Sequence, residues 1–195
     1  MRGHLILVAC AAMACLACSV PDGDQTTPSG THYLWLAARA EGGVDRLWEL
    51  LDPSVKAEFE RWHQAEGELV KMLRTEYPKE DAVKALNAIG GPFRGDAADG
   101  KALFKLFMRP APDALGMMGA AAAHVRSEEI AADGKTATIR TFGGDEVVFV
   151  KGADGKWYTT MPSDDLERLR NARSLAEQNL ARVKSNLKKL GRPGQ

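Results

Sequence analysis

Apolar residues recur every three or four positions from Thr31 to about Ala123, the spacing of one face of an amphipathic helix. Asp52-Pro53 is a typical helix start, because the Asp side chain caps free amide groups and Pro fits the first turn. The predicted helices run from Thr31 to Gly42, Val44 to Leu51, Asp52 to near Pro78, Lys79 to Ile89 and Asp99 to Pro110. The third of these should bury Val55, Phe59, Trp62, Leu69 and Leu73.

The apolar period then changes from 3.6 to 2. Ala137 and Ile139 alternate with Thr138 and Arg140, as in a strand with one buried face. Asp133-Gly134, Gly143-Gly144 and Asp154-Gly155 are strong signals for hairpin turns. The pattern predicts four antiparallel strands, over His124–Ile130, Lys135–Phe142, Glu146–Lys151 and Lys156–Met161.

A long last helix is predicted from Ser163 to Leu190. Its apolar positions are spaced 3-4-3-4 in a heptad interrupted by Arg173, and its far half carries Leu180, Val183, Leu187 and Leu190. At 1.5 Å per residue this helix would be about 42 Å long, more than the width of a four-stranded sheet. We therefore predict that this far half is an interaction surface for a protein partner or a second copy, unless the preceding helices extend far enough to cover it.

These elements define an α+β fold, with N-terminal helices, a four-stranded antiparallel meander and a long C-terminal helix. Their order, with Gly155-Lys156-Trp157 at the last hairpin, resembles the nuclear-transport-factor-two-like (cystatin-related) superfamily over about Thr31 to Pro162. The resemblance implies a curved sheet wrapped around a helix. The predicted organisation is a signal peptide over 1–18, a flexible tether over 19–30, the α+β domain over 31–162, the helix over 163–190 and a tail over 191–195.

The first eighteen residues have the character of a signal peptide. Arg2 supplies a positive start, and Leu5 to Cys18 is an apolar run of fourteen residues. A membrane-spanning helix needs roughly 20 apolar residues, so this run is too short to span. The run holds all three cysteines, Cys10, Cys15 and Cys18, so the rest of the chain has no disulfide and no cysteine ligand.

The stretch Ala14-Cys15-Leu16-Ala17-Cys18-Ser19 resembles the lipobox of bacterial lipoproteins, in which a cysteine after a small residue is acylated. The resemblance implies lipidation at Cys18, with Cys15 as the alternative. It also implies anchoring at the periplasmic face of the outer membrane, because Ser19 and not Asp follows Cys18. Cleavage after Ala12-Met13-Ala14 would instead give a soluble periplasmic protein.

Composition narrows the function classes further. Basic and acidic residues balance at 26 each, so no global field draws in nucleic acid. The chain has no G-x-S-x-G, H-E-x-x-H or EF-hand motif, so the common hydrolase, zincin and EF-hand signatures fail. No cofactor and no metal are expected. Glu60 and His63 form a single E-x-x-H step, whereas a di-iron bundle requires two.

The four tryptophans, Trp35, Trp48, Trp62 and Trp157, are candidates either for the core or for an apolar ligand pocket. The sequence as a whole favours a lipid-anchored envelope protein that binds a ligand or protein without catalysis. The alternative is a small-pocket, isomerase-like enzyme in which Tyr33 or Tyr158 works with an Asp.

Overall fold

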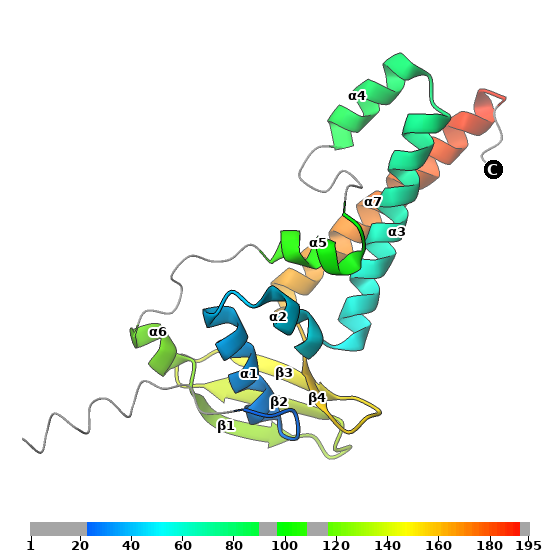
Figure 1. The fold of residues 1–195 in the computed structure, drawn as a ribbon. Helices are drawn as coiled ribbons and strands as arrows, with labels where there is room; N and C mark the ends of the chain where they lie inside the picture. The colour runs from blue at the N-terminus through cyan, green and yellow to red at the C-terminus, as the bar shows by residue number, and fades with distance from the viewer. Residues whose placement is uncertain (1–22, 90–96, 109–116, 192–195) are drawn as a thin grey trace, which may run out of the picture. The chain divides into compact units, whose positions relative to one another are not determined.

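A computed structural model describes residues 23–89, 97–108 and 117–191 (Figure 1). It has the predicted α+β architecture, with helices first, then a four-stranded antiparallel sheet and a long C-terminal helix. The chain divides into a sheet unit, made of Met1–Leu50 and Pro110–Thr160, and a helical unit, made of Leu51–Arg109 and Met161–Gln195. Each unit combines two separate stretches of chain, whereas the sequence suggests one domain over 31–162.

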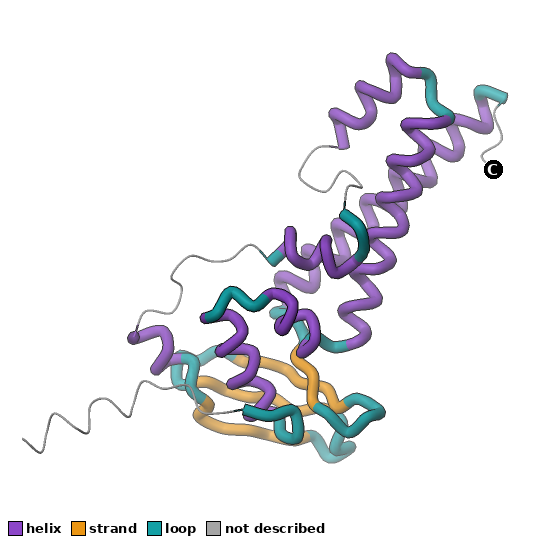
Figure 2. The backbone as a smooth tube through the Cα atoms, viewed as in Figure 1, coloured by secondary structure: helices purple, strands orange, loops and turns teal. Residues whose placement is uncertain are grey.

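The sheet is a meander in which consecutive strands are neighbours (Figure 2). Glycines at its turns, Gly134, Gly144 and Gly155, have φ angles of 65°, 90° and 79°, in the left-handed region that favours glycine. The predicted hairpins are therefore correct, and β3 has the predicted bounds. The strands are β1 (Val125–Ile130), β2 (Thr136–Thr141), β3 (Glu146–Lys151) and β4 (Trp157–Thr159).

Helix α1 (Pro28–Ala40) covers one face of the sheet (Figure 2). The strand residues that point to this face form a buried cluster of Ala137, Ile139, Phe149 and Trp157. His32 of α1 meets Phe149 edge-on, with ring centroids 6.3 Å apart. Val148, which points to the other face, is 42% exposed. The alternation read from the sequence thus distinguishes the two faces correctly.

The sequence predicts that the first helix begins at Thr31, but helix α1 begins at Pro28 in the structure. Thr27 is the N-cap, and its Oγ1 accepts a hydrogen bond from the Gly30 amide at 3.0 Å. Thr27-Pro28 carries the same cap-and-proline signal as Asp52-Pro53. Just before it, the Gln25 carbonyl accepts a bond from the Trp157 amide at 2.8 Å. Residues 25–30, expected in the tether, therefore belong to the sheet unit.

Two short helices complete the described part of the sheet unit, α2 (Val44–Leu50) and α6 (Met117–Ala122). Helix α2 packs against α1 and buries Leu47 and Leu50. The carbonyl of Ala123, just after α6, accepts a 2.8 Å hydrogen bond from His32 Nε2. This bond ties the start of the sheet segment to α1.

The helical unit contains α3 (Pro53–Thr75), α4 (Lys79–Ile89), α5 (Gly100–Phe107) and α7 (Ser163–Lys189). Both Asp caps are present, since Asp52 accepts from the Ser54 amide at 2.9 Å and Asp99 from the Ala102 amide at 2.7 Å. All five apolar residues predicted to be buried on α3 are buried. Local capping thus accounts for where α3 and α5 begin, and periodicity accounts for which face of α3 is apolar.

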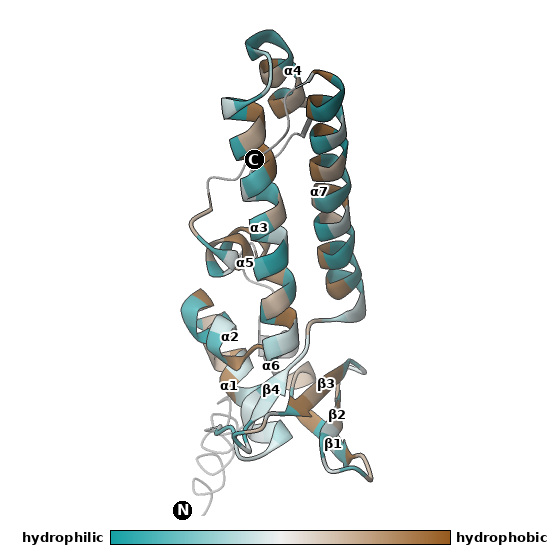
Figure 3. Ribbon diagram, turned by 90° about the vertical axis from the view of Figure 1, so that its right-hand side faces the viewer, coloured by the Kyte–Doolittle hydropathy of each residue, from teal (hydrophilic) through white to brown (hydrophobic). Residues whose placement is uncertain are grey.

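Helices α3 and α7 lie side by side and run parallel (Figures 1 and 3). Three polar pairs show that the helices run in the same direction, because the residue numbers of both partners increase from one pair to the next. These pairs are Glu58–Arg173 at 2.7 Å, Glu68–Lys184 at 2.7 Å and Tyr77–Asn186 at 3.0 Å. Parallel helices cannot be joined by a tight turn, so the chain between them must travel back along their length.

The apolar seam of α7 is covered by α3, which removes the argument that an uncovered seam needs a partner. Leu180, Val183 and Leu187 are buried and cluster with Leu69, Met72 and Leu73 of α3. The alternative left open by the sequence holds, because α3, at 23 residues, is long enough to extend along α7. Leu190 differs from the others and is 56% exposed.

A second face of α3 packs on α5 through aromatic side chains. Phe59 meets Phe104 and Phe107 in edge-to-face contacts, with centroid distances of 5.4 and 5.6 Å. The Arg168 guanidinium of α7 lies 4.6 Å from the centroid of the Phe107 ring, in cation–π geometry. The described core of the helical unit is thus aromatic toward α5 and aliphatic toward the far half of α7.

We expect Leu187→Ala to lower the free energy of unfolding by about 2–5 kcal/mol, because Leu187 is fully buried and its removal leaves a cavity. Leu190→Ala, at the exposed C-cap of the same helix, is the matched control and should change stability by less than about 0.5 kcal/mol. Urea unfolding measures both. Unchanged stability together with a smaller assembly for Leu187→Ala would instead make the seam an interface between molecules.

Candidate functional site

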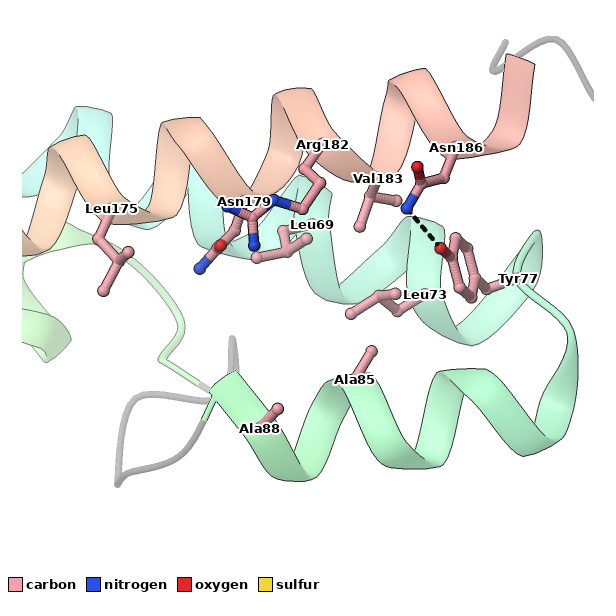
Figure 4. A pocket seen from close by; sticks show the side chains of 10 residues that line it. All are labelled: Leu69, Leu73, Tyr77, Ala85, Ala88, Leu175, Asn179, Arg182, Val183 and Asn186. Carbon is pink, nitrogen blue, oxygen red and sulfur yellow. Dashed lines mark hydrogen bonds between the residues drawn. The ribbon is translucent and has the colours of Figure 1, made fainter. Parts of the chain in front are cut away.

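The helical unit contains a pocket between α3, α4 and α7 (Figure 4). Its volume is about 380 Å³, at the lower end of the usual range for small-molecule sites. The residues come from two stretches of chain, one carrying α3 and α4 and the other carrying α7. The pocket therefore exists only when the parallel pair α3–α7 has formed.

The α3 and α4 side of the pocket is mainly apolar. Leu69 and Leu73 of α3 lie behind this side and belong to the packed core, because they are 1% and 0% exposed. Ala85 and Ala88 of α4 point toward α7 across the pocket (Figure 4). Because an alanine side chain ends at Cβ, α4 leaves space that larger residues would fill.

The α7 side of the pocket is mainly polar and carries Leu175, Asn179, Arg182, Val183 and Asn186. Asn179 and Arg182 project from α7 into the space in front of α4 (Figure 4). At one end, Asn186 Nδ2 donates a 3.0 Å hydrogen bond to the Tyr77 hydroxyl, which joins α7 to the turn after α3. The pocket therefore has one apolar and one polar side.

The structure distributes the four candidate tryptophans over both units. Trp157 is buried in the sheet core, and Trp35 and Trp48 are half-buried on α1 and α2. Trp62 packs in the helical unit against Phe59 and Phe107, at centroid distances of 6.3 and 6.4 Å. None of the four lines the pocket between α3, α4 and α7. Trp62 and Trp157 are core residues here, as one of the two sequence interpretations had it.

The tyrosines proposed for the isomerase-like alternative make structural hydrogen bonds. The Tyr33 hydroxyl accepts from the Val125 amide at 3.3 Å. Tyr158 donates to Asp154 Oδ2 at 2.8 Å across the exposed β3–β4 turn, and this bond raises the pKa of Tyr158 and lowers that of Asp154. The pair is a Tyr and an Asp as that alternative requires, but it lies on an exposed turn and not in a buried cavity.

Glu60 and His63, the E-x-x-H residues, hold the segment that begins α5. His63 Nε2 donates to the Ala97 carbonyl at 3.0 Å, and Glu60 Oε2 accepts from the Gly100 amide at 3.3 Å. A Cβ at Gly100 would lie 2.7 Å from the Glu60 carboxyl carbon, so glycine permits this close approach. Within 23–89, 97–108 and 117–191, no cluster of three or more His, Cys, Asp and Glu side chains could hold a metal ion.

The lipidation candidates Cys18 and Cys15 lie outside the described residues, so the lipobox stays a prediction. Among the described helices, none combines the length and the apolar character needed to cross a membrane.

Glu66 of α3 is a buried carboxyl group that the sequence interpretation missed. It is 6% exposed, and its Oε2 has no hydrogen-bond partner among the described residues. Burial raises the pKa of Glu66 from 4.5 to about 7. Helical spacing could have found it, because Glu66 lies four positions after Trp62 and three before Leu69, on the apolar side of the helix.

The polar residues of the pocket gave no comparable signal, whereas the apolar spacing had already marked Leu69, Leu73 and Val183. Asn179 and Arg182 fall between the heptad positions of α7, where polar residues are typical of a solvated helix face. Nothing local to α7 indicates that α4 lies opposite them.

Comparisons with known proteins place the chain in no family: no family model matches the sequence, and neither a curated protein nor a solved structure matches it. The resemblances to the lipobox and to the nuclear-transport-factor-two-like superfamily therefore stay predictions.

Glu66→Gln should stabilise the protein at pH 8 by about 1–3 kcal/mol, because it removes a charge that is unfavourable in the buried site. The pKa of Glu66 is raised in the folded state, so the wild type loses stability as the pH rises from about 4.5 through about 7. The advantage of the variant should therefore shrink at pH 4.5. Urea unfolding at both pH values measures it, with the exposed Glu167→Gln as control. An equal effect at both pH values would contradict the prediction.

Proposed function

We propose that the chain is an exported protein, anchored by a lipid on Cys18 at the periplasmic face of the outer membrane. Its folded part binds a ligand or a protein without catalysing a reaction. The apolar run from Leu5 to Cys18 and its resemblance to a lipobox support the anchor. Cys15 is the alternative site of acylation, and a soluble periplasmic protein is the alternative without an anchor.

The pocket of the helical unit is the observation that supports a binding role. Leu175, Ala85 and Ala88 offer apolar contact area, while Asn179, Arg182 and Asn186 offer hydrogen bonds that orient a ligand. The pocket is built on helices and not on loops, and the buried seam between α3 and α7 holds two of its three helices together. A preformed pocket reduces the ordering cost of binding.

The anchor would hold the sheet unit close to the bilayer. Gln25 is bonded to Trp157, so only residues 19–24 separate the sheet unit from Cys18. Six residues reach about 21 Å at most when fully extended, which is an upper limit on the distance between Cys18 and the sheet unit. This spacer is half as long as the twelve-residue tether expected from the sequence.

Cys18→Ser is expected to release the protein from the membrane fraction into the soluble fraction, because acylation provides the anchor. One acyl chain gives only marginal binding, so stable anchoring needs the several chains typical of the lipoprotein family. Fractionation followed by immunoblotting measures the distribution, and mass spectrometry of the N-terminal peptide reports its acylation.

Cys15→Ser is the matched control and should leave the protein in the membrane fraction. Release by Cys15→Ser but not by Cys18→Ser would move the anchor to Cys15. If neither substitution releases the protein and no peptide is acylated, the lipoprotein proposal is wrong.

A further inference from the structure

Arg182 carries a positive charge that no described residue neutralises. Two other cations of α7 are paired, because Arg173 lies 2.7 Å from both Glu58 and Glu177, and Lys184 lies 2.7 Å from Glu68. Arg182 has no such ion pair within the described part of the chain, although its side chain projects into the pocket (Figure 4). The residues that line the pocket include no carboxylate.

Asn179 lies three residues before Arg182, so the two side chains are neighbours on one face of α7. In Figure 4 both point into the space between α7 and α4. A guanidinium group binds carboxylate or phosphate oxygens through two parallel hydrogen bonds, and the adjacent amide can donate a third. This side of the pocket therefore fits an anionic group.

The opposite side fits an apolar chain. Ala85 and Ala88 are accessible apolar positions whose short side chains leave the space beside α4 open, while Leu69 and Leu73 are covered behind it. At the end away from Tyr77, Leu175 is 58% exposed although it is a large apolar residue. An exposed leucine at the edge of an apolar pocket would be covered by a chain that extends out of it.

From these two sides we infer that the pocket binds a small amphiphile with one alkyl or acyl chain and an anionic head group. The head group contacts Arg182 and Asn179, and the chain lies on Ala85, Ala88 and Leu175. The inference rests on the proposed binding function and names the chemical class of its ligand.

Isothermal titration calorimetry on the full chain in phosphatidylcholine nanodiscs tests the inference, with empty nanodiscs as the blank. The probes are decanoate and decyl phosphate below their micelle concentrations, neutral decanol below its solubility limit, and acetate. Decanoate and decyl phosphate should bind roughly tenfold or more tightly than decanol, because a hydrogen bond to a charged group adds at least that much. Acetate should bind far more weakly than decanoate.

Two variants separate the two sides of the pocket. Arg182→Gln should bring the affinity for decanoate down to that for decanol, whereas Arg170→Gln, on an exposed position of the same helix, should change neither. Ala88→Leu should weaken decanoate and decanol alike, because it fills the space beside α4. Circular dichroism before titration verifies that each variant is folded.

Equal affinity for decanoate and decanol, or no effect of Arg182→Gln, would overturn the anionic head group and leave the binding function standing. Acetate binding as tightly as decanoate would overturn the apolar chain. If none of the probes binds, the inference fails as a whole, while the membrane anchor is still decided by Cys18→Ser.

Discussion

The parallel packing of α3 on α7 is the contact on which the helical unit depends. Leu180, Val183 and Leu187 pack on leucines and a methionine of α3, while α5 and α4 each lie against another part of α3. Two residues that interrupt this apolar seam are charged and behave differently. Arg173 is matched by Glu58 at 2.7 Å, whereas Glu66 is buried with an unpaired oxygen. The charge of Arg173 is therefore balanced by an ion pair, whereas a charge on Glu66 would destabilise the folded state.

Much of the fold follows from signals that act over a few residues. Asp52 and Asp99 cap helices because their side chains reach amides two or three positions away, and alternation along β2 decides which residues face α1. The start of α1 was missed only because Thr27-Pro28 was assigned to the tether. The partner of α7 could not be predicted in this way, because the heptad pattern shows that a seam exists but not which helix covers it.

The candidate site was harder to predict than the fold, for a related reason. A pocket is a property of three helices, and its polar residues look like solvated positions when α7 is considered alone. Ala85 and Ala88 help to form the pocket because their short side chains leave space beside α4, and no sequence pattern predicts such a space. Glu66 is the exception. Its position follows the apolar spacing of α3 although its side chain is a carboxylate, and this mismatch can be seen in the sequence.

The long separation between the paired helices has a consequence for how the protein is made. Tyr77 and Asn186 are joined by a hydrogen bond although they are 109 positions apart in the sequence. During synthesis from the N-terminus, α3 therefore emerges with its leucines bare, and the whole sheet segment must follow before α7 can cover them. Contacts between residues far apart in the sequence form slowly, and apolar surface stays exposed until they form. The nascent chain thus passes through a long interval in which the face of α3 that packs on α7 is not yet covered by α7.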